Sequence, residues 1–295
     1  MASFCNIEKI IRGRVLFDEP LKKHTTFRIG GPARVWAEPI DPKDIKEIVS
    51  FAIDAAIPLE VIGNGSNLLV HDMGLNRIAI SLSAPHFKRA KTEKDSIRVG
   101  AGLHISEMLE YCCQKGLSGL ERLTGIPGTI GGALAMNGGD IGSNVEEVHT
   151  ITKSGRERLF KQKDISFGYR RSDLEGFIIT EAKLSVKQST SVDVRALCKK
   201  HLDEKRATQD LGSLSAGCIF KNPEDIDLSA GELVESLGFK GKRCGGALVS
   251  EKHANFIVNS DGASFGDVME LIEMIRDKAK EERSVNLELE VKILG

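Results

Sequence analysis

The feature that most constrains this chain is a glycine-rich stretch in its middle. Residues 125–139 read GIPGTIGGALAMNGG, and six of the fifteen are glycine. Glycine leaves backbone N–H groups uncovered and permits positive φ, so the stretch can lie directly against a flat or anionic ligand. Thr129 can cap a short helix through Ala135, and the first N–H groups of that helix suit a phosphate. Taken alone, the stretch is equally consistent with a tightly packed turn between two elements.

A second glycine-rich segment, residues 63–70 with the sequence GNGSNLLV, follows an expected buried strand at 59–62. Its glycines resemble a dinucleotide-binding fingerprint, but Leu68 stands at the third glycine position, so that pattern fails. The segment is not a Walker A loop either, because no Gly-Lys-Ser/Thr follows. What remains is a polar turn after a strand, where backbone amides, Ser66 and Asn67 could hold a phosphate.

The N-terminal part predicts an α/β opening. Residues 4–11 have the pattern of a short amphipathic helix with Phe4, Ile7, Ile10 and Ile11 on one side. Asp41 followed by Pro42 is typical of a helix start, and apolar residues recur at helical spacing behind it. Further along, the pattern predicts strands at 33–37, 77–82, 86–89 and 96–99, a helix ended by Gly116, a hairpin around Ser154 and Gly155, a strand at 177–186, and a helix at 192–208 with Val194, Leu197, Cys198 and Leu202 facing inward.

The C-terminal part has a different sequence pattern. Ser229 and Glu232 form a capping-box pattern that opens a helix through Leu237, and Ser264 opens a second helix with a regular apolar stripe. Residues 241–246 are basic and expected to be flexible. Two strands are expected, at 255–259 and at 285–293, the second with odd-numbered residues facing one way and Glu288, Glu290 and Lys292 the other.

Composition excludes several classes of protein. The 295 residues include 41 basic and 42 acidic side chains, with no basic stripe, so nucleic acid is not expected as a partner. No long apolar run or secretory h-region is present, which predicts a soluble cytoplasmic protein without a membrane span. The six cysteines form no C-x-x-C pair and fit neither a zinc site nor a disulfide scaffold, so most are expected to be buried small residues, and no metal is expected.

Several short motifs follow one another along nearly the full length of the chain. They are TTFRIGGP at 25–32, GNGSNLL at 63–69, the whole of 125–139, GYR at 168–170, GCIFKNP at 217–223, HANF at 253–256 and LEV at 289–291. In these motifs and their order the chain resembles the UDP-N-acetylenolpyruvoylglucosamine reductases of bacterial cell-wall synthesis. Between Arg170 and Cys218 there is no room for the tyrosine-bearing loop of one branch of the family, so the chain resembles the shorter branch.

The resemblance implies an α+β fold with an FAD-binding domain of the vanillyl-alcohol-oxidase type in two parts and a C-terminal α/β substrate domain. The implied boundaries are 1–73, joined by the terminal strand 284–295, then 74–208, and 209–283 for substrate. FAD is expected to be bound non-covalently, with NADPH as hydride donor. The residues implied to line FAD are Arg28, Gly63, Asn64, Gly65, Ser66, Asn67, Leu68, Gly125, Ile126, Pro127, Gly128, Thr129, Gly131, Gly132, Ala133, Asn137 and Gly138.

The implied reaction reduces an enolpyruvyl carbon–carbon double bond, which requires a cation at the substrate carboxylate and an acid for its α-carbon. By resemblance, Arg170 grips the carboxylate, Glu290 helps to polarise it, and Cys218 donates the proton in place of the serine of many members. Without the resemblance, Arg170 is expected to be a surface cation beside Arg171. Glu290 is then expected on the polar face of a strand, and Cys218 is expected to be a packing residue.

The implied substrate is UDP-N-acetylglucosamine enolpyruvate, and the chain is expected to be a monomer. Two other functions fit some of the same features: an FAD-dependent oxidase acting on a hydroxyl substrate, and a non-catalytic flavin- or sugar-nucleotide-binding module. The trio of catalytic candidates favours the reductase over both. The implied substrate contacts are Tyr169, Lys221, Asn222, His253 and Asn255, with Lys242 and Arg243 as weaker candidates.

Overall fold

The structure is a computed structural model that describes Phe4 and residues 6–295. The chain forms two compact units, each built from segments that are separated in sequence. Unit 1 contains the residues up to Glu19, Arg34–Asn64 and Asn76–Asp203, and unit 2 contains Pro20–Ala33, Gly65–Leu75 and Glu204–Gly295. The three-part domain boundaries expected from the sequence stay a prediction.

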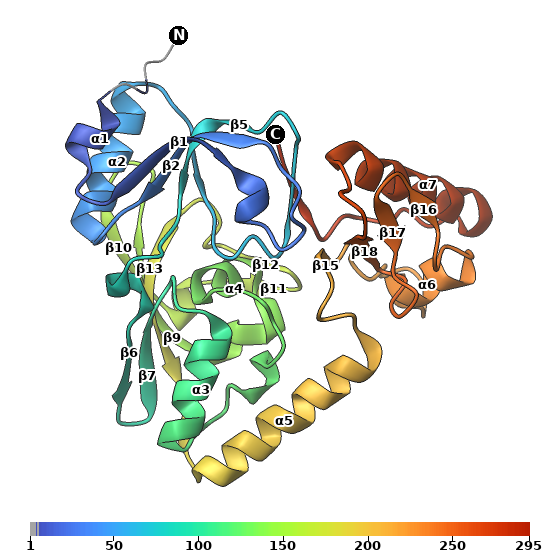
Figure 1. Ribbon diagram of the computed structural model, residues 1–295. Helices are drawn as coiled ribbons and strands as arrows, with labels where there is room; N and C mark the ends of the chain where they lie inside the picture. The colour runs from blue at the N-terminus through green and yellow to red at the C-terminus, as the bar shows by residue number, and fades with distance from the viewer. Residues whose placement is uncertain (1–3, 5) are drawn as a thin grey trace. The chain divides into compact units, whose positions relative to one another are not determined.

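The first sheet carries the expected α/β opening (Figure 1). Its strand order is β1 (Arg14–Pro20), β2 (Pro32–Glu38), β5 (Leu75–Ile80) and β3 (Leu59–Val61), with β3 parallel to β5. Helix α2 (Pro42–Asp54) starts as predicted, because the Asp41 carboxylate accepts the backbone N–H of Asp44 at 2.9 Å. Its apolar stripe is fully buried. Helix α1 is shorter than expected, Ile7–Ile10, and Ile10 is exposed.

The second sheet of unit 1 is antiparallel, in the order β10 (Glu157–Lys161), β9 (Val145–Ile151), β13 (Ile178–Ser185), β7 (Ser96–Gly100) and β6 (Ala90–Glu93). The predicted hairpin and the strand at 177–186 are confirmed. The predicted strand at 86–89 is wrong, since Pro85–Lys88 is a 3-10 turn, η2. Pro85 has the fixed φ of a first helical position, and the Phe87 N–H donates to the Ala84 carbonyl.

Short elements in the connections between strands of the second sheet, and one strand after them, complete unit 1. Helix α3 (Ile105–Lys115) ends at Gly116 in a left-handed conformation, as predicted. After the turn η3 (Glu121–Leu123) come α4 (Ile130–Met136) and the 3-10 segment η4 (Gly138–Asn144). The remaining strands pair as two short antiparallel ladders, β8 (Leu117–Ser118) with β14 (Lys187–Gln188) and β11 (Phe167–Gly168) with β12 (Arg171–Ser172).

Unit 2 is built on a four-stranded antiparallel sheet of order β15 (Ser215–Cys218), β18 (Phe256–Asn259), β17 (Ala247–Val249) and β16 (Arg243–Cys244). Helices α6 (Ala230–Ser236) and α7 (Phe265–Arg283) carry the predicted capping boxes, and their apolar stripes belong to the same core as the sheet. Separately, β19 (Lys292–Leu294) runs parallel to β4 (Leu68–Val70).

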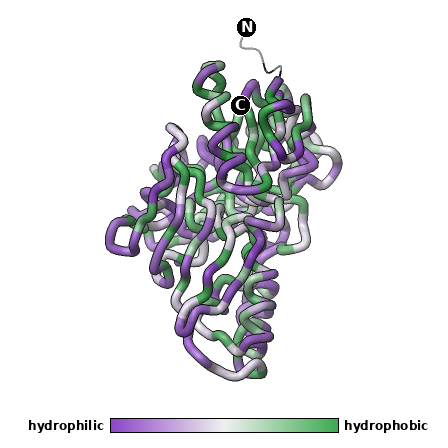
Figure 2. The backbone as a smooth tube through the Cα atoms, turned by 90° about the vertical axis from the view of Figure 1, so that its left-hand side faces the viewer, coloured by the Kyte–Doolittle hydropathy of each residue, from purple (hydrophilic) through white to green (hydrophobic). Residues whose placement is uncertain are grey.

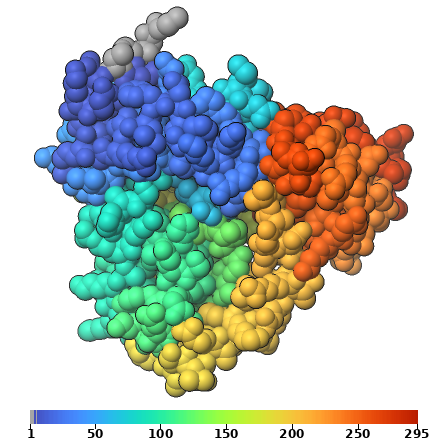
Figure 3. Space-filling model, viewed as in Figure 1, coloured from blue at the N-terminus to red at the C-terminus, as the bar shows by residue number. Residues whose placement is uncertain are grey.

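Four other predictions need correction. The strand at 59–62 is half-exposed, because β3 lies at the edge of its sheet. Residues 241–246 are ordered by β16, with the Val249 N–H donating to the Lys242 carbonyl. Helix α5 (Ser191–Thr208) buries Val194 but exposes Leu197, and Figure 3 shows this helix, in yellow, at the surface.

The predicted long strand at 285–293 is the fourth. Its alternation of buried odd positions holds at Val285, Leu287 and Val291, but Ile293 is exposed and Leu294 is buried. The N–H groups of Glu290 and Val291 both donate to the Ile219 carbonyl, at 2.8 and 3.3 Å. From Lys292 on, the chain pairs with β4 and no longer with the segment at 219–220, and the alternation of buried positions changes at this switch of partner.

Cysteines follow the prediction only in part. Cys112 and Cys113 are buried, whereas Cys198, Cys218 and Cys244 are partly exposed, and Cys5 lies outside the described residues.

Hydrophobic and hydrophilic segments alternate along the chain (Figure 2), and among the described residues no helix is both long and apolar enough to cross a membrane.

Candidate functional site

The central glycine-rich stretch forms the start of helix α4, as its sequence predicts. Thr129 is the N-cap, and its hydroxyl accepts the Gly132 N–H at 3.4 Å. Backbone hydrogen bonds hold this stretch against residues 101–103, because the Ile130 and Gly131 N–H groups donate to the carbonyls of Leu103 and Ala101. The first N–H groups of α4 are therefore bonded within the protein, and what this end of α4 offers a ligand is a partial positive charge and an exposed glycine backbone.

The two glycine-rich segments meet within unit 1 at Gly63 and Asn64. A Cβ atom on Gly63 would lie 2.5 Å from the Thr129 hydroxyl oxygen, so only glycine allows this approach. Asn64 donates from its amide nitrogen to the Pro127 carbonyl at 2.5 Å. The structure therefore brings together two loops that the sequence linked only by their shared glycine content.

Arg170 lies in a tight two-residue hairpin loop between β11 and β12. Gly168 pairs with Arg171 across the hairpin, and Arg170 itself has a left-handed backbone, with φ of 56°. The Arg170 guanidinium carbon lies 5.5 Å from the ring centroid of Tyr169, which is 54% exposed. A guanidinium beside an exposed aromatic ring is a pairing that suits recognition of an anionic group.

Three contacts from α4 and η4 hold the hairpin in place. The Ser172 hydroxyl donates to the Ala135 carbonyl at 3.0 Å. The Asn137 amide donates to the Gly168 carbonyl at 3.1 Å. A Cβ atom on Gly142 would lie 2.4 Å from the Phe167 ring, so glycine at 142 allows the ring to pack directly on the backbone of η4. The position of Arg170 thus depends on the turn that follows α4.

Cys218 and Glu290 lie on neighbouring segments of unit 2. The Ile219 carbonyl accepts the Glu290 N–H, and Phe220 pairs with Leu289 in an isolated antiparallel bridge. These contacts place the residue after Cys218 directly beside Glu290. On the other side of Glu290, its carbonyl accepts the Asn67 amide at 3.0 Å. Backbone hydrogen bonds therefore bring the segment that follows Cys218 next to the segment that carries Glu290.

The rest of the glycine-rich segment 65–68 also belongs to this part of unit 2. The Thr26 hydroxyl donates to the Ser215 carbonyl at 2.6 Å, and the Thr26 N–H donates to the Gly65 carbonyl. Thr26 therefore ties the segment to β15. Arg28 is exposed, has a left-handed backbone with φ of 57°, and donates to the Lys23 carbonyl.

Comparison with known proteins identifies the family to which this arrangement belongs. A reductase named UDP-N-acetylenolpyruvoylglucosamine reductase 2 from Symbiobacterium thermophilum is 38% identical over 98% of this chain and 96% of its own length. The chain belongs to the UDP-N-acetylenolpyruvoylglucosamine reductase family. The family's C-terminal domain matches residues 209–294, and an FAD binding domain matches residues 33–156.

Other members agree over the same length. The UDP-N-acetylenolpyruvoylglucosamine reductase of Bacillus velezensis is 38% identical over 96% of this chain and 95% of its own. The crystal structure of the Thermus caldophilus reductase, MurB, superposes with a TM-score of 0.82 at 32% identity, covering 97% of this chain and all of that one. The expected fold class, α+β with a flavin domain of the vanillyl-alcohol-oxidase type and a separate C-terminal domain, is confirmed.

The residues of unit 1 fit the FAD that the family uses. Gly132 at the Thr129-capped start of α4 is exposed, with no atom nearer than 3.5 Å to a Cβ built on it, so the backbone there is open to close approach by a ligand. Gly125, Ile126, Gly128, Gly138 and Asn137 are partly exposed along the same stretch, whereas Ala133 is buried, so contact through its side chain is limited.

The predicted substrate residues of unit 2 are engaged in different ways. Lys221 lies at the surface, with its ammonium 3.0 Å from the Glu288 carboxylate. Asn222 caps the start of α6 by accepting the Ala230 N–H at 3.0 Å. His253 is partly buried against Phe256, and burial lowers the pKa of its imidazole. Asn255 is 2% exposed, and its amide both accepts the Phe220 N–H and donates to the Phe220 carbonyl.

These contacts change the expected role of Asn255. Its amide is used to hold Phe220, so Asn255 positions the segment that follows Cys218, and a direct contact with substrate is not supported. The weaker candidate Arg243 donates to the Ser260 hydroxyl at the end of β18. Arg122 was not among the sequence candidates, although its guanidinium contacts the turn after α4; a long-range network of this kind leaves no local signal in the sequence.

Proposed function

We propose that Arg170, Cys218 and Glu290 carry the reaction of this enzyme. The chain is a flavin-dependent oxidoreductase that uses NADPH and FAD to reduce the enolpyruvyl double bond of UDP-N-acetylglucosamine enolpyruvate, giving UDP-N-acetylmuramate for peptidoglycan precursors. The observation that supports the residue assignment is the hydrogen bond that sets Ile219, the residue after Cys218, beside Glu290.

Hydride transfer to the enolpyruvyl β-carbon is the chemistry that FAD supplies when bound. Negative charge then builds at the substrate α-carbon and spreads into its carboxylate. We assign Arg170 to this carboxylate, because a guanidinium stays charged and can bind both oxygens at once. The left-handed hairpin loop that carries Arg170 fixes its backbone, so the cation is oriented before substrate binds.

Cys218 is assigned as the acid that protonates the α-carbon. An unperturbed thiol has a pKa of about 8.5, so it gives up a proton far more readily than a serine hydroxyl. β15 ends at Cys218, and Gly217 before it has φ of 77°, a conformation that glycine adopts without strain.

Glu290 is assigned to the same carboxylate as Arg170, as a protonated carboxyl group or through a water molecule. Its backbone is fixed on both sides, by Ile219 and by Asn67. A carboxyl group held this firmly can polarise the developing charge without a large reorganisation.

For the remainder of the substrate we assign Tyr169, Lys221 and Asn222, with His253 as a further contact. Lysine and asparagine supply a cation and an amide that suit the diphosphate and the sugar. The proposal includes a monomeric chain in the cytoplasm, where both nucleotide substrates are soluble; light scattering and cell fractionation test these two points.

Two half-reactions test the proposed function. The purified protein should be yellow, should release free FAD on denaturation, and should bleach under anaerobic conditions with NADPH. Addition of the enolpyruvyl sugar should then restore the oxidised flavin spectrum. A colourless protein that does not bind added FAD would contradict the proposal. Formation of hydrogen peroxide from a hydroxyl substrate without NADPH would indicate an oxidase, and ligand binding without flavin reoxidation would indicate a binding module.

A further inference from the structure

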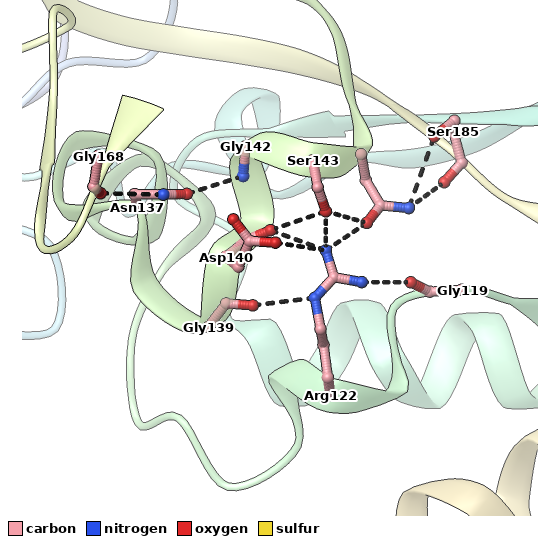
Figure 4. Close-up of polar contacts among 10 residues, drawn as sticks. Gly119, Arg122, Asn137, Gly139, Asp140, Gly142, Ser143, Gly168 and Ser185 are labelled. Carbon is pink, nitrogen blue, oxygen red and sulfur yellow. Dashed lines mark hydrogen bonds and ion pairs between the residues drawn. The ribbon is translucent and has the colours of Figure 1, made fainter. Parts of the chain in front are cut away.

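Arg122 makes an unusually dense set of hydrogen bonds around the turn that follows α4 (Figure 4). Its guanidinium is only partly exposed and donates to five acceptors in two parts of the chain, residue 119 and residues 139–144. The acceptors are the carbonyls of Gly119 (3.1 Å), Gly139 (3.0 Å) and Asp140 (2.7 Å), the Ser143 hydroxyl, and the Asn144 amide oxygen (2.6 Å).

The turn held by Arg122 has a backbone that needs such support. Asn137, Gly139 and Asp140 all have left-handed conformations, with φ of 46°, 60° and 55°. Two of these three are not glycine, and such residues persist in this conformation only when their surroundings fix them. The carbonyls of Gly139 and Asp140 both point at the guanidinium, as Figure 4 shows, so Arg122 binds the turn in this one geometry.

The same turn determines where the Arg170 hairpin lies. The Asn137 amide donates to the Gly168 carbonyl and accepts the Gly142 N–H at 3.0 Å. The Phe167 ring packs on Gly142. A continuous set of contacts therefore runs from Arg122 through the turn and Asn137 to the residue two positions before Arg170, all within unit 1.

We propose that Arg122 is a positioning residue for the reduction step, acting through the turn at 137–140 on the position of Arg170. The inference rests on the proposed role of Arg170. Arg122 does not touch the reacting atoms in this scheme; it fixes the backbone from which the guanidinium of Arg170 reaches the substrate carboxylate.

The substitution Arg122→Lys tests this, because lysine keeps the charge but cannot bond all these acceptors from one planar group. We expect reoxidation of reduced flavin by the enolpyruvyl sugar to slow by about 10- to 100-fold, the effect of a small misplacement of a catalytic group. Arg98→Lys is a matched control, because Arg98 also binds several partners in unit 1, Glu93 and Glu181 among them, on the sheet rather than at the turn. This control should lower thermal stability to a similar extent and leave reoxidation unchanged.

A double-mutant cycle separates positioning from general stabilisation. If Arg122 acts through Arg170, the variant carrying both Arg122→Lys and Arg170→Lys should be no slower in reoxidation than Arg170→Lys alone. Multiplicative losses would mean that Arg122 acts independently, and the inference would be overturned. Equal reoxidation rates for Arg122→Lys and wild type would overturn it as well.

The cycle also distinguishes this inference from the proposed function. Normal reoxidation by Arg170→Lys alone would reject the role of Arg170 and the inference with it, whereas a slow Arg170→Lys beside a normal Arg122→Lys rejects only the inference. Should Arg122→Lys fail to fold, Ser143→Ala removes a single acceptor of Arg122. It should slow reoxidation more mildly and again show no further loss when combined with Arg170→Lys, and a multiplicative loss there would count against the inference.

Discussion

Replacing Asn255 by alanine should weaken both the fold of unit 2 and the reduction step. Asn255 and Phe220 are 2% and 1% exposed, and the Asn255 amide satisfies both the N–H and the carbonyl of Phe220. The variant leaves two buried backbone groups unpaired, each at a cost of about 1–3 kcal/mol, so we expect a total loss of about 2–4 kcal/mol if water reaches one of them. Because Phe220 is two residues from Cys218, the same change should displace the proton donor.

Urea unfolding at saturating FAD measures the loss of stability, and stopped-flow reoxidation of reduced flavin measures the kinetic effect. The matched control is Asn259→Ala at the far end of β18, the strand that Asn255 precedes. Asn259 also bonds two backbone groups, the Phe27 carbonyl at 3.0 Å and the Ala263 N–H at 2.8 Å, and neither belongs to Phe220. It should lose stability with little change in reoxidation. The reasoning is refuted if Asn255→Ala unfolds at the wild-type urea concentration, or if both variants slow reoxidation equally.

Further predictions concern the catalytic candidates and one buried thiol. In the Cys218→Ala variant, NADPH should reduce the flavin at the normal rate, but the rate of flavin reoxidation should fall by about 10²–10⁴-fold, as expected for removal of a general acid. Full activity of this variant would indicate that Cys218 only packs. Cys218→Ser should recover much of the activity and resist alkylation, with the modified residue mapped by mass spectrometry. Arg170→Lys and Glu290→Gln should slow reoxidation much more than reduction by NADPH; equal slowing of both steps would indicate binding or folding roles instead. Burial raises the pKa of Cys113 to about 11, so its alkylation should be slow at neutral pH and accelerate up to that pH, and a neutral rate matching that of Cys218 would contradict this.

Local signals in the sequence were sufficient for several elements. Asp41 before Pro42 and the apolar stripe behind them predicted α2, and Ser264 with its stripe predicted α7, because caps and helical periodicity involve residues within a turn or two of one another. Thr129 likewise predicted the start of α4. The family could be predicted because its motifs are short and occur in a fixed order along nearly the whole chain.

Contacts between distant residues set the features that could not be predicted. The change of face at Ile293 falls where the chain leaves the segment at 219–220 and begins to pair with β4, which lies more than two hundred residues earlier in the sequence. Arg122 bonds mostly to backbone carbonyls 17 and 18 residues away and to side chains 21 and 22 residues away. Any residue supplies a backbone carbonyl, so the identities of the acceptors carry little information about the network.

The parallel pairing of β4 with β19 has a consequence for synthesis on the ribosome. β4 follows directly on the glycine-rich segment at 65–67, yet its partner, Lys292–Leu294, is made more than two hundred residues later. During most of translation the emerging chain therefore presents β4 without its partner, and Asn67 cannot reach the Glu290 carbonyl. Unit 1 has no such dependence, since its core residues end at Val186 and can pack while the remainder is still being made. Folding during synthesis is thus expected in two stages, with unit 2 closing only after residues 290–294 have left the exit tunnel.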